Sequence, residues 1–482
     1  MKKFKYIKLA FLLILFGSCT LSDFKDMNID KKTASQAIPS YMLTNAIRYI
    51  PEALLMSNEP QVSFWMQYWT QIPYVSHELY NFTEVGFPFY QTVLVNLQYI
   101  IDQNTNPTTK SKVSSYGDNN NQLAIAKILK AYYYLSLTDR WGDIPYFDAL
   151  KGEKGGDFLR AKVDKQKDIY YDLFKELTEA VNQVDENAIV SVKGDILFSG
   201  NMRKWKKLAN TTRLIMALRI SNVDPDKGKI EFNAALNASD GIIESNNENL
   251  QYTFINDELG NNYNYMYNWN NSSSYPYAMC KTLIDYMKNL NDPRLPYYAD
   301  KAAATNDYVG QAVATIGEQS KFSRMGINMR QKETPMFIYS YAQVLFSLSE
   351  GVVRGWTSGD AELLYNKAIK SSLEQYTVYD PTSYATYMNL SDVKYNATNP
   401  YKTIGYQKWL ALYPYGHEAW AEWRRLGYPK LTPPVGAITP DGQLPRRFVY
   451  SISMKNLMPD QFIEVEKRQP DKPNTYIWWD VK

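Results

Sequence analysis

The stretch from residue 263 to residue 277 concentrates side chains that could contact a ligand. Six of its fifteen residues are aromatic, and most of the others are Asn or Ser. Asn and Ser side chains compete for backbone hydrogen bonds, which disfavours a helix, and burial of the whole stretch would leave many amides without partners. Flat rings with a polar tip suit a wet recognition surface as well as a core, so the residue types alone leave both uses open.

The rings at the start of this stretch alternate with smaller or polar residues. Tyr263, Tyr265, Tyr267 and Trp269 are each separated by one residue. If the segment is extended, a period of two places the rings on one face and the amides on the other. The alternative is a half-buried strand or loop that packs its rings on the body of the protein. The candidate ligand contacts here are Tyr263, Tyr265, Tyr267, Trp269, Asn270, Asn271 and Tyr275.

A second aromatic stretch, at residues 64–82, offers another set of rings. Trp65 and Trp69 are four residues apart, which places them on one face if the segment is helical, and Tyr68 lies between them. The helical pattern breaks further on, near Tyr74 and His77. The start of the stretch is compatible with a buried helix. The candidate ligand contacts are Trp65, Tyr68, Trp69 and Tyr74.

The sequence offers little to an enzyme. It has only two histidines, and His417 is followed by Glu418-Ala419-Trp420-Ala421, so no H-E-x-x-H zinc motif is present. No G-x-S-x-G elbow, P-loop or G-x-G-x-x-G motif occurs. A glycosidase needs only two carboxylates, which leave no sequence signature, and we interpret His417 and Glu418 as a packed polar pair. We therefore predict no catalytic residue, no metal site and no cofactor, and leave Ca²⁺ binding open.

The N-terminus predicts export. Four lysines precede an apolar run from Leu9 to Phe16, which is too short to span a bilayer. Gly17, Ser18 and Cys19 follow it as in a bacterial lipobox. We expect residues 1–18 to be a lipoprotein signal peptide and Cys19 to carry the lipid. An ordinary secretory signal is the alternative.

Removal of the signal peptide changes the electrostatics of the chain. Four lysines and no acid are lost, so the formal net charge falls from +3 to −1. A nearly neutral mature protein gives no support for nucleic-acid binding. With Cys19 lipidated, Cys280 has no intramolecular partner and no internal disulfide is expected.

The body of the chain is predicted to be helical. Apolar residues recur at helical spacing near residues 122–142, 169–184, 202–220, 335–355 and 361–376, and Pro335 is taken as a first-turn residue. Trp205, Leu208 and Ala209 match part of the tetratricopeptide pattern. Residues 20–36 lack periodicity and are predicted to form a tether.

Three stretches together resemble the SusD/RagB-like family of Bacteroidetes outer-membrane nutrient-binding lipoproteins, and specifically its divergent second branch. They are LTDRWGDIPYFDAL at 137–150, WKKLANTTRLIMALRI at 205–220, and QKWLALYPYGHEAWAEWRRLGYPKL at 407–431 with LPRRFVY at 444–450 and IWWD at 477–480. The chain departs from the family pattern at Gln343, where Glu is usual, and at Ser451 and Met454, which replace Pro and Glu. These positions look like scaffold, so a local difference in hydrogen bonding is expected.

The resemblance implies an all-α, SusD-like fold of imperfect tetratricopeptide helix pairs, with long loop insertions forming a ligand face. It implies a lipidated tether at 19–36, one helical domain at 37–482, anchorage at the cell-surface side of the outer membrane, and partnership with a SusC-like TonB-dependent transporter. Sugars stack their C–H faces on rings and bond their hydroxyls to amides, and the stretch at 263–277 supplies both. We therefore predict a non-catalytic glycan-binding protein for nutrient uptake. The alternatives are a peptide- or protein-binding lipoprotein of the same import system and a surface glycosidase.

Overall fold

The chain is built mainly from helices, and the computed structural model describes residues 37–55, 60–81, 86–256, 262–268 and 276–481. The longer helices are α3 (Pro39–Arg48), α6 (Val95–Thr105), α8 (Asn119–Trp141), α9 (Gln166–Gln183), α10 (Met202–Arg219), α11 (Pro225–Leu236), α15 (Tyr341–Val353), α16 (Ala361–Gln375), α18 (Pro400–Ala411) and α19 (Gly416–Leu426). The shorter helices are α4 (Ile50–Leu55), α5 (Gln61–Trp65), α7 (Lys110–Val113), α13 (Lys281–Asn289), α14 (Leu295–Tyr298), α17 (Pro381–Met388), α20 (Ile452–Leu457) and α21 (Pro459–Arg468).

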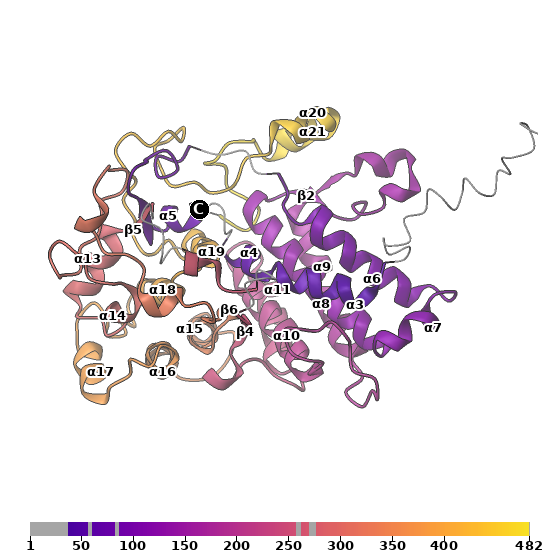
Figure 1. Cartoon of the computed structure of the whole chain (residues 1–482), viewed down its shortest axis with the longest axis horizontal. Coiled ribbons are helices and arrows are strands. Elements are labelled where there is room, and N and C mark those ends of the chain that lie inside the picture. Colours follow the sequence, from indigo (N-terminus) through magenta and orange to yellow (C-terminus); the bar gives the residue numbers. More distant parts are fainter. Residues whose placement is uncertain (1–36, 56–59, 82–85, 257–261, 269–275, 482) are drawn as a thin grey trace, which may run out of the picture.

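Neighbouring helices pack in pairs. The most extensive contacts join α15 with α16, α8 with α9, α10 with α11, and α6 with α8, and α3 packs on α6. In Figure 1 the N-terminal pairs lie on the right, and α13, α14, α16 and α17 lie on the left. The predicted all-α fold of helix pairs is confirmed.

Amphipathic spacing and side-chain caps explain where these helices form. In α9 the buried residues Ile169, Leu173, Leu177 and Ala180 recur every three or four positions, which gives one apolar stripe. Helix α8 is buried on most sides because other helices surround it. An Asp or Asn side chain accepts a hydrogen bond from the first turn of α8, α10, α11, α16 and α18, which satisfies one otherwise unpaired N–H group in each.

The strands are short and antiparallel. They are β1 (Trp69–Gln71) with β5 (Tyr277–Met279), β2 (Ile144–Pro145) with β3 (Val163–Asp164), and β4 (Leu250–Tyr252) with β6 (Met336–Tyr339). The predicted helix beginning at Pro335 is therefore wrong at its start. Residues 336–339 pair with β4 instead, and α15 begins after Ser340, whose side chain caps it by accepting from the backbone N–H of Gln343 at 3.2 Å.

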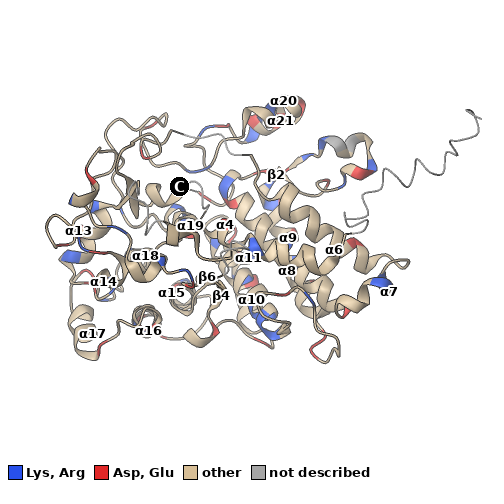
Figure 2. Cartoon of the chain, in the orientation of Figure 1, with Lys and Arg blue, Asp and Glu red and all other residues tan. Residues whose placement is uncertain are grey.

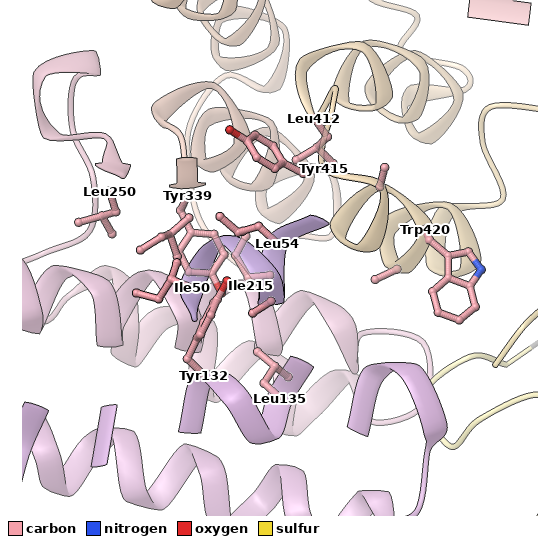
Figure 3. Packing of buried hydrophobic residues seen from close by; sticks show 14 of the residues in the cluster. Ile50, Leu54, Tyr132, Leu135, Ile215, Leu250, Tyr339, Leu412, Tyr415 and Trp420 are labelled. Atoms are coloured by element: carbon pink, nitrogen blue, oxygen red, sulfur yellow. The ribbon is translucent and has the colours of Figure 1, made fainter. Parts of the chain in front are cut away.

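The apolar core is continuous from the N-terminal helices to the C-terminal ones. In Figure 3 Tyr132 of α8 and Tyr339 of β6 lie next to each other, and Ile50 and Leu54 of α4 pack beside them. The aromatic rings of the scaffold motifs belong to this core, since Trp205, Trp420 and Trp479 are fully buried. These three tryptophans serve packing.

A set of charged side chains, all buried except the partly exposed Glu418, joins α10, α15, α18 and α19. We call it the buried charge network; its members are Arg219, Glu350, Lys408, Glu418, Glu422 and Arg425. Gln343, the departure from the family pattern, donates its amide to Glu418 at 3.0 Å. Elsewhere Lys and Arg are interspersed with Asp and Glu over the molecule, as Figure 2 shows.

Candidate functional site

The predicted aromatic stretch begins with a tight turn that a buried asparagine holds in place. Asn264 is 0 % exposed. Its side chain donates to the carbonyl oxygen of Thr334 at 2.9 Å and accepts from the backbone N–H of Met266 at 3.0 Å. Residues Tyr265–Tyr267 form a single 3₁₀ turn, so residues 263–268 are not the extended segment considered for them, whereas Tyr277, at the end of the stretch, begins β5.

This turn buries Asn264 and Met266 and leaves the tyrosines half-buried. The rings of Tyr263 and Tyr267 meet edge to face, with centroids 6.2 Å apart. The Lys332 ammonium lies 4.7 Å from the centroid of the Tyr267 ring, a cation–π arrangement. Burial raises the pKa of the Tyr265 phenol well above its usual value, and the nearby Glu52 carboxylate adds to the shift.

Tyr263 and Tyr265 line a cavity of about 370 Å³, which we call the Tyr263 pocket. Its other described lining residues are Asn45, Arg48, Tyr49, Pro51, Glu52, Tyr252, Phe254 and Asn262. Three separate segments meet here: the junction of α3 and α4, the residues that end and follow β4, and the aromatic stretch. Only the last of these was predicted from the sequence.

Hydrogen bonds and ring contacts fix the walls of the Tyr263 pocket. Asn45 donates to the carbonyl oxygen of Thr92 at 2.9 Å, and the Tyr252 hydroxyl donates to Asn262 at 3.0 Å. The rings of Tyr252 and Phe254 are 4.9 Å apart. The pocket therefore offers ring faces, amides and both signs of charge on supported positions, a combination that orients a polar ligand on an apolar surface.

Comparison with known proteins shows the family. Residues 30–451 match the model of the second SusD-like family, described as "Starch-binding associating with outer membrane". The chain belongs to this family. Similar solved structures include a chitin-binding protein, with 26 % identity and a TM-score of 0.78 over 92 % of this chain and 100 % of that one. Another is a SusD homolog from Bacteroides uniformis, with 25 % identity and a TM-score of 0.77 over 92 % of this chain and 100 % of that one. A chitin-binding SusD homolog from Flavobacterium johnsoniae shares the fold, with 22 % identity and a TM-score of 0.73 over 92 % of this chain and 98 % of that one. The comparison with curated proteins gives no significant match.

The second predicted cluster of this SusD-like chain is wrong in three of its four residues. Trp65 and Tyr68 are 0 % exposed and Trp69 is 1 % exposed. Helix α5 ends at Trp65, and Trp69 lies in β1, so the two tryptophans do not share one helical face. Trp65 packs edge to face on Trp420, and Tyr68 stacks on Trp409. These rings support the fold and cannot reach a surface ligand.

Tyr74, the fourth residue of that cluster, is 63 % exposed and stays a predicted contact. Tyr74 lies in the loop between β1 and Glu78. The buried Glu78 carboxylate accepts hydrogen bonds from the backbone N–H groups of Gln71 and Ala314, and so joins this loop to the one that contains Ala314. Burial raises the pKa of Glu78 to about 7, against the opposing effect of these hydrogen bonds. Trp269, Asn270, Asn271, Tyr275 and Cys19 lie outside the described residues.

His417 and Glu418 form part of the scaffold, as predicted. They line a small cavity of about 60 Å³ between α4, α8 and α19. Arg219 donates to both oxygens of Glu418 at 2.9 Å. Burial, together with Arg140 and Arg424, holds the pKa of His417 well below its usual value. The pair serves packing and charge balance.

Two further properties concern only the part of the chain that the structure describes. None of its helices combines the length and apolar character needed to cross a bilayer. Within the same residues, no three His, Cys, Asp or Glu side chains come together as metal ligands would. Cys280 is a free, buried thiol.

Proposed function

We propose that this SusD-like protein binds a nutrient glycan at the outer surface of the cell and delivers it to a SusC-like TonB-dependent transporter. The observation that carries the proposal is the Tyr263 pocket. It combines half-buried tyrosine rings with amides, Arg48 and Glu52 on a chain of a starch-binding family. Rings stack on the C–H faces of a sugar while the amides and charged groups bond its hydroxyls.

The number of carboxylates that line the Tyr263 pocket favours binding without hydrolysis. Glycoside hydrolysis uses a pair of Asp or Glu side chains about 5–10 Å apart. Glu52 is the single carboxylate among the described lining residues. This supports a binding role over that of a surface glycosidase.

The location at the membrane rests on the N-terminus. We propose that residues 1–18 are removed, that Cys19 is lipidated, and that residues 19–36 tether a single helical domain at 37–482. The family description as associating with the outer membrane supports the same location.

The test is retardation of the mature protein in native gels containing starch, soluble chitin oligosaccharides, other polysaccharides or peptides. We expect one glycan class to bind. Tyr263→Ala should weaken that binding about tenfold, or ~1.4 kcal/mol, because the stacking face is lost. Tyr263→Phe keeps the ring and should bind nearly as wild type. Trp269→Ala tests the remainder of the predicted stretch.

The matched control is Tyr41→Ala, which removes an exposed ring from α3 at a position outside the pocket and should bind as wild type. Binding of peptides alone would move the function to the peptide-binding alternative. Release of reducing ends from any glycan would show that the protein is a hydrolase. Full binding by Tyr263→Ala would remove the Tyr263 pocket from the proposal.

A further inference from the structure

A second cavity, of about 300 Å³, shares no residue with the Tyr263 pocket. It lies between α13, one face of α18, the connection that precedes α18, and the segment that follows α19. Its described lining includes Tyr286, Tyr406 and Trp409 together with Lys394, Lys402 and Lys430. We call it the lysine pocket.

The aromatic side of the lysine pocket is anchored in the core. Tyr68 stacks on Trp409 with centroids 5.5 Å apart, Trp409 meets Tyr286 at 6.1 Å, and Tyr286 stacks on Tyr406 at 5.2 Å. The indole N–H of Trp409 also donates to the carbonyl oxygen of Met66 at 3.1 Å. Half-buried rings held by buried ones form a pre-organised apolar face.

Its rim is positively charged. Three lysines face one aspartate, Asp392, among the described lining residues. In the part of the chain that the structure describes, none of the three ammonium groups has a carboxylate within the 4.0 Å of an ion pair. The Lys430 ammonium instead lies 4.5 Å from the centroid of the Tyr428 ring. Lysines gathered around a concavity raise the local concentration of anions.

Polar groups between the rings and the lysines complete the chemistry. Thr282, Thr403 and Asn396 also line the cavity. The backbone N–H of Lys430 donates to the Tyr406 hydroxyl at 3.3 Å, which orients that ring. Hydroxyl and amide groups match the hydroxyls of a sugar, and a cavity of this size is at the small end for ligand sites.

From this combination we propose that the lysine pocket is a second glycan site, which binds an anionic sugar unit bearing a carboxylate or a sulfate. The sugar ring stacks on the face formed by Tyr286 and Tyr406. Its anionic group lies among Lys394, Lys402 and Lys430, and its hydroxyls bond to the Asn396 amide and to the hydroxyl oxygen of Thr282. The site is independent of the Tyr263 pocket, so either one can fail without the other.

The experiment compares an oligogalacturonate with the same oligomer after methyl esterification, which removes the charge and keeps the sugar. Binding to the mature protein is measured by calorimetry, and a sulfated glycan, heparin, is run in parallel to separate carboxylate from sulfate. We expect an anionic ligand to bind more tightly than the neutral ester. Its affinity should fall as NaCl rises from about 0.05 to about 0.5 M, because salt screens exposed charges.

Variants locate the site. Lys402→Gln/Lys430→Gln should weaken binding of the anionic ligand about tenfold, as expected for the loss of two exposed charge contacts, and should leave the ester unchanged. Lys321→Gln, at an exposed lysine outside the pocket, is the matched control and should bind as wild type. Tyr263→Ala should also leave this binding intact.

Three outcomes would overturn the proposal. The first is that the acid and its methyl ester bind with equal affinity and that heparin binds no more tightly than the ester. The second is anionic binding that the double lysine variant retains in full, because the ligand would then bind elsewhere. The third is equal loss in Lys321→Gln and the double variant, which would show only a general attraction of anions to the protein.

Discussion

The two ends of α18 use the same residue type in opposite ways. Lys408, near the end of the helix, is 1 % exposed, and its ammonium lies 2.8 Å from Glu422 and 3.2 Å from the Ser347 hydroxyl. Lys402, six residues earlier, is exposed at the lysine pocket. A buried ammonium needs partners to offset its lost hydration, whereas an exposed one keeps its water until a ligand displaces it.

The buried charge network shows what that requirement means. Burial alone would raise the pKa of the Glu422 carboxyl, but Arg425, Lys408 and Arg219 together hold it below its usual value. Glu350 is likewise held below its usual pKa against burial, by Arg425 and Arg354. Each member depends on the others, so the network constrains sequence change. The exposed lysines of the lysine pocket have no such partners in the described part of the chain, so they can be exchanged without loss of the fold.

The largest expected effect comes from breaking the network. Arg425→Met removes the guanidinium that donates to Glu350 and Glu422, at 2.6 Å in each case. It leaves two buried carboxylates with fewer partners. We expect the free energy of unfolding to fall by about 3–5 kcal/mol, measured by urea denaturation at pH 7.

The matched control for that experiment is Lys467→Met. Lys467 pairs with Glu464, and both side chains are 64 % exposed, so its loss should change stability by less than about 0.5 kcal/mol. Equal stability of Arg425→Met and the control would mean that the network is no more important than a surface ion pair.

The next effect is a pH dependence of the free energy of unfolding, caused by Glu78 in the loop that carries Tyr74. The folded pKa of Glu78, about 7, exceeds the usual value near 4.5 because of burial. Its neutral form is therefore favoured by folding. The stability that this gives is present below about pH 4 and is lost as the pH rises through 7. Between pH 5 and pH 8 the loss should reach about 2–3 kcal/mol.

Comparison of wild type with Glu78→Gln isolates the contribution of Glu78 to the pH dependence. Burial also raises the pKa of Asp480 to about 6, but this effect is the same in both proteins and cancels in their difference. The amide cannot ionise, and its NH₂ group loses one of the two backbone contacts. The variant should be less stable than wild type at pH 5. Between pH 5 and pH 8 its free energy of unfolding should rise relative to that of wild type by about 2–3 kcal/mol. A constant difference between the two across this range would contradict the assignment.

Helical periodicity predicted most of the fold correctly because the apolar stripes of α9 and α16 are amphipathic and local. It failed at residues 336–339, where a proline and an apolar run resemble a helix start. The register with β4, almost ninety residues earlier, decides their structure. The family motifs also have physical reasons: Gly142, at φ 81° after α8, approaches Gln469 so closely that a Cβ atom would lie 2.3 Å from its side-chain oxygen.

The candidate sites were less predictable. Tyr263 and Tyr265 were found from composition, but their partners Arg48, Tyr49 and Glu52 come from a helix junction two hundred residues earlier and carry no motif. The alternation of Tyr252 and Phe254 around Thr253 was the one local signal that could have pointed to the pocket wall. The lysine pocket has no local signal, because its three lysines come from three segments: the connection before α18, α18 itself and the segment that follows α19.

The smallest effect is expected at Tyr74, a surface ring that lies in one short segment with the core ring of Trp69. Trp69 and Tyr74 are five residues apart and were predicted as members of one cluster, yet Trp69 is 1 % and Tyr74 63 % exposed. Tyr74→Ala should change the free energy of unfolding by less than about 0.5 kcal/mol, and Trp69→Ala should lower it by about 3–5 kcal/mol. Both are measured by urea denaturation.

Glycan retardation of the same two variants, under conditions where both are folded, then tests what the Tyr74 ring does. If Tyr74 contacts ligand, Tyr74→Ala weakens binding a few-fold at unchanged stability, whereas Tyr74→Phe keeps the ring and binds as wild type. Unchanged binding in Tyr74→Ala would remove the last member of the second cluster from the ligand face. The predicted ligand contacts would then be those of the stretch at 263–277, whose described tyrosines are half-buried and held in place by neighbouring side chains.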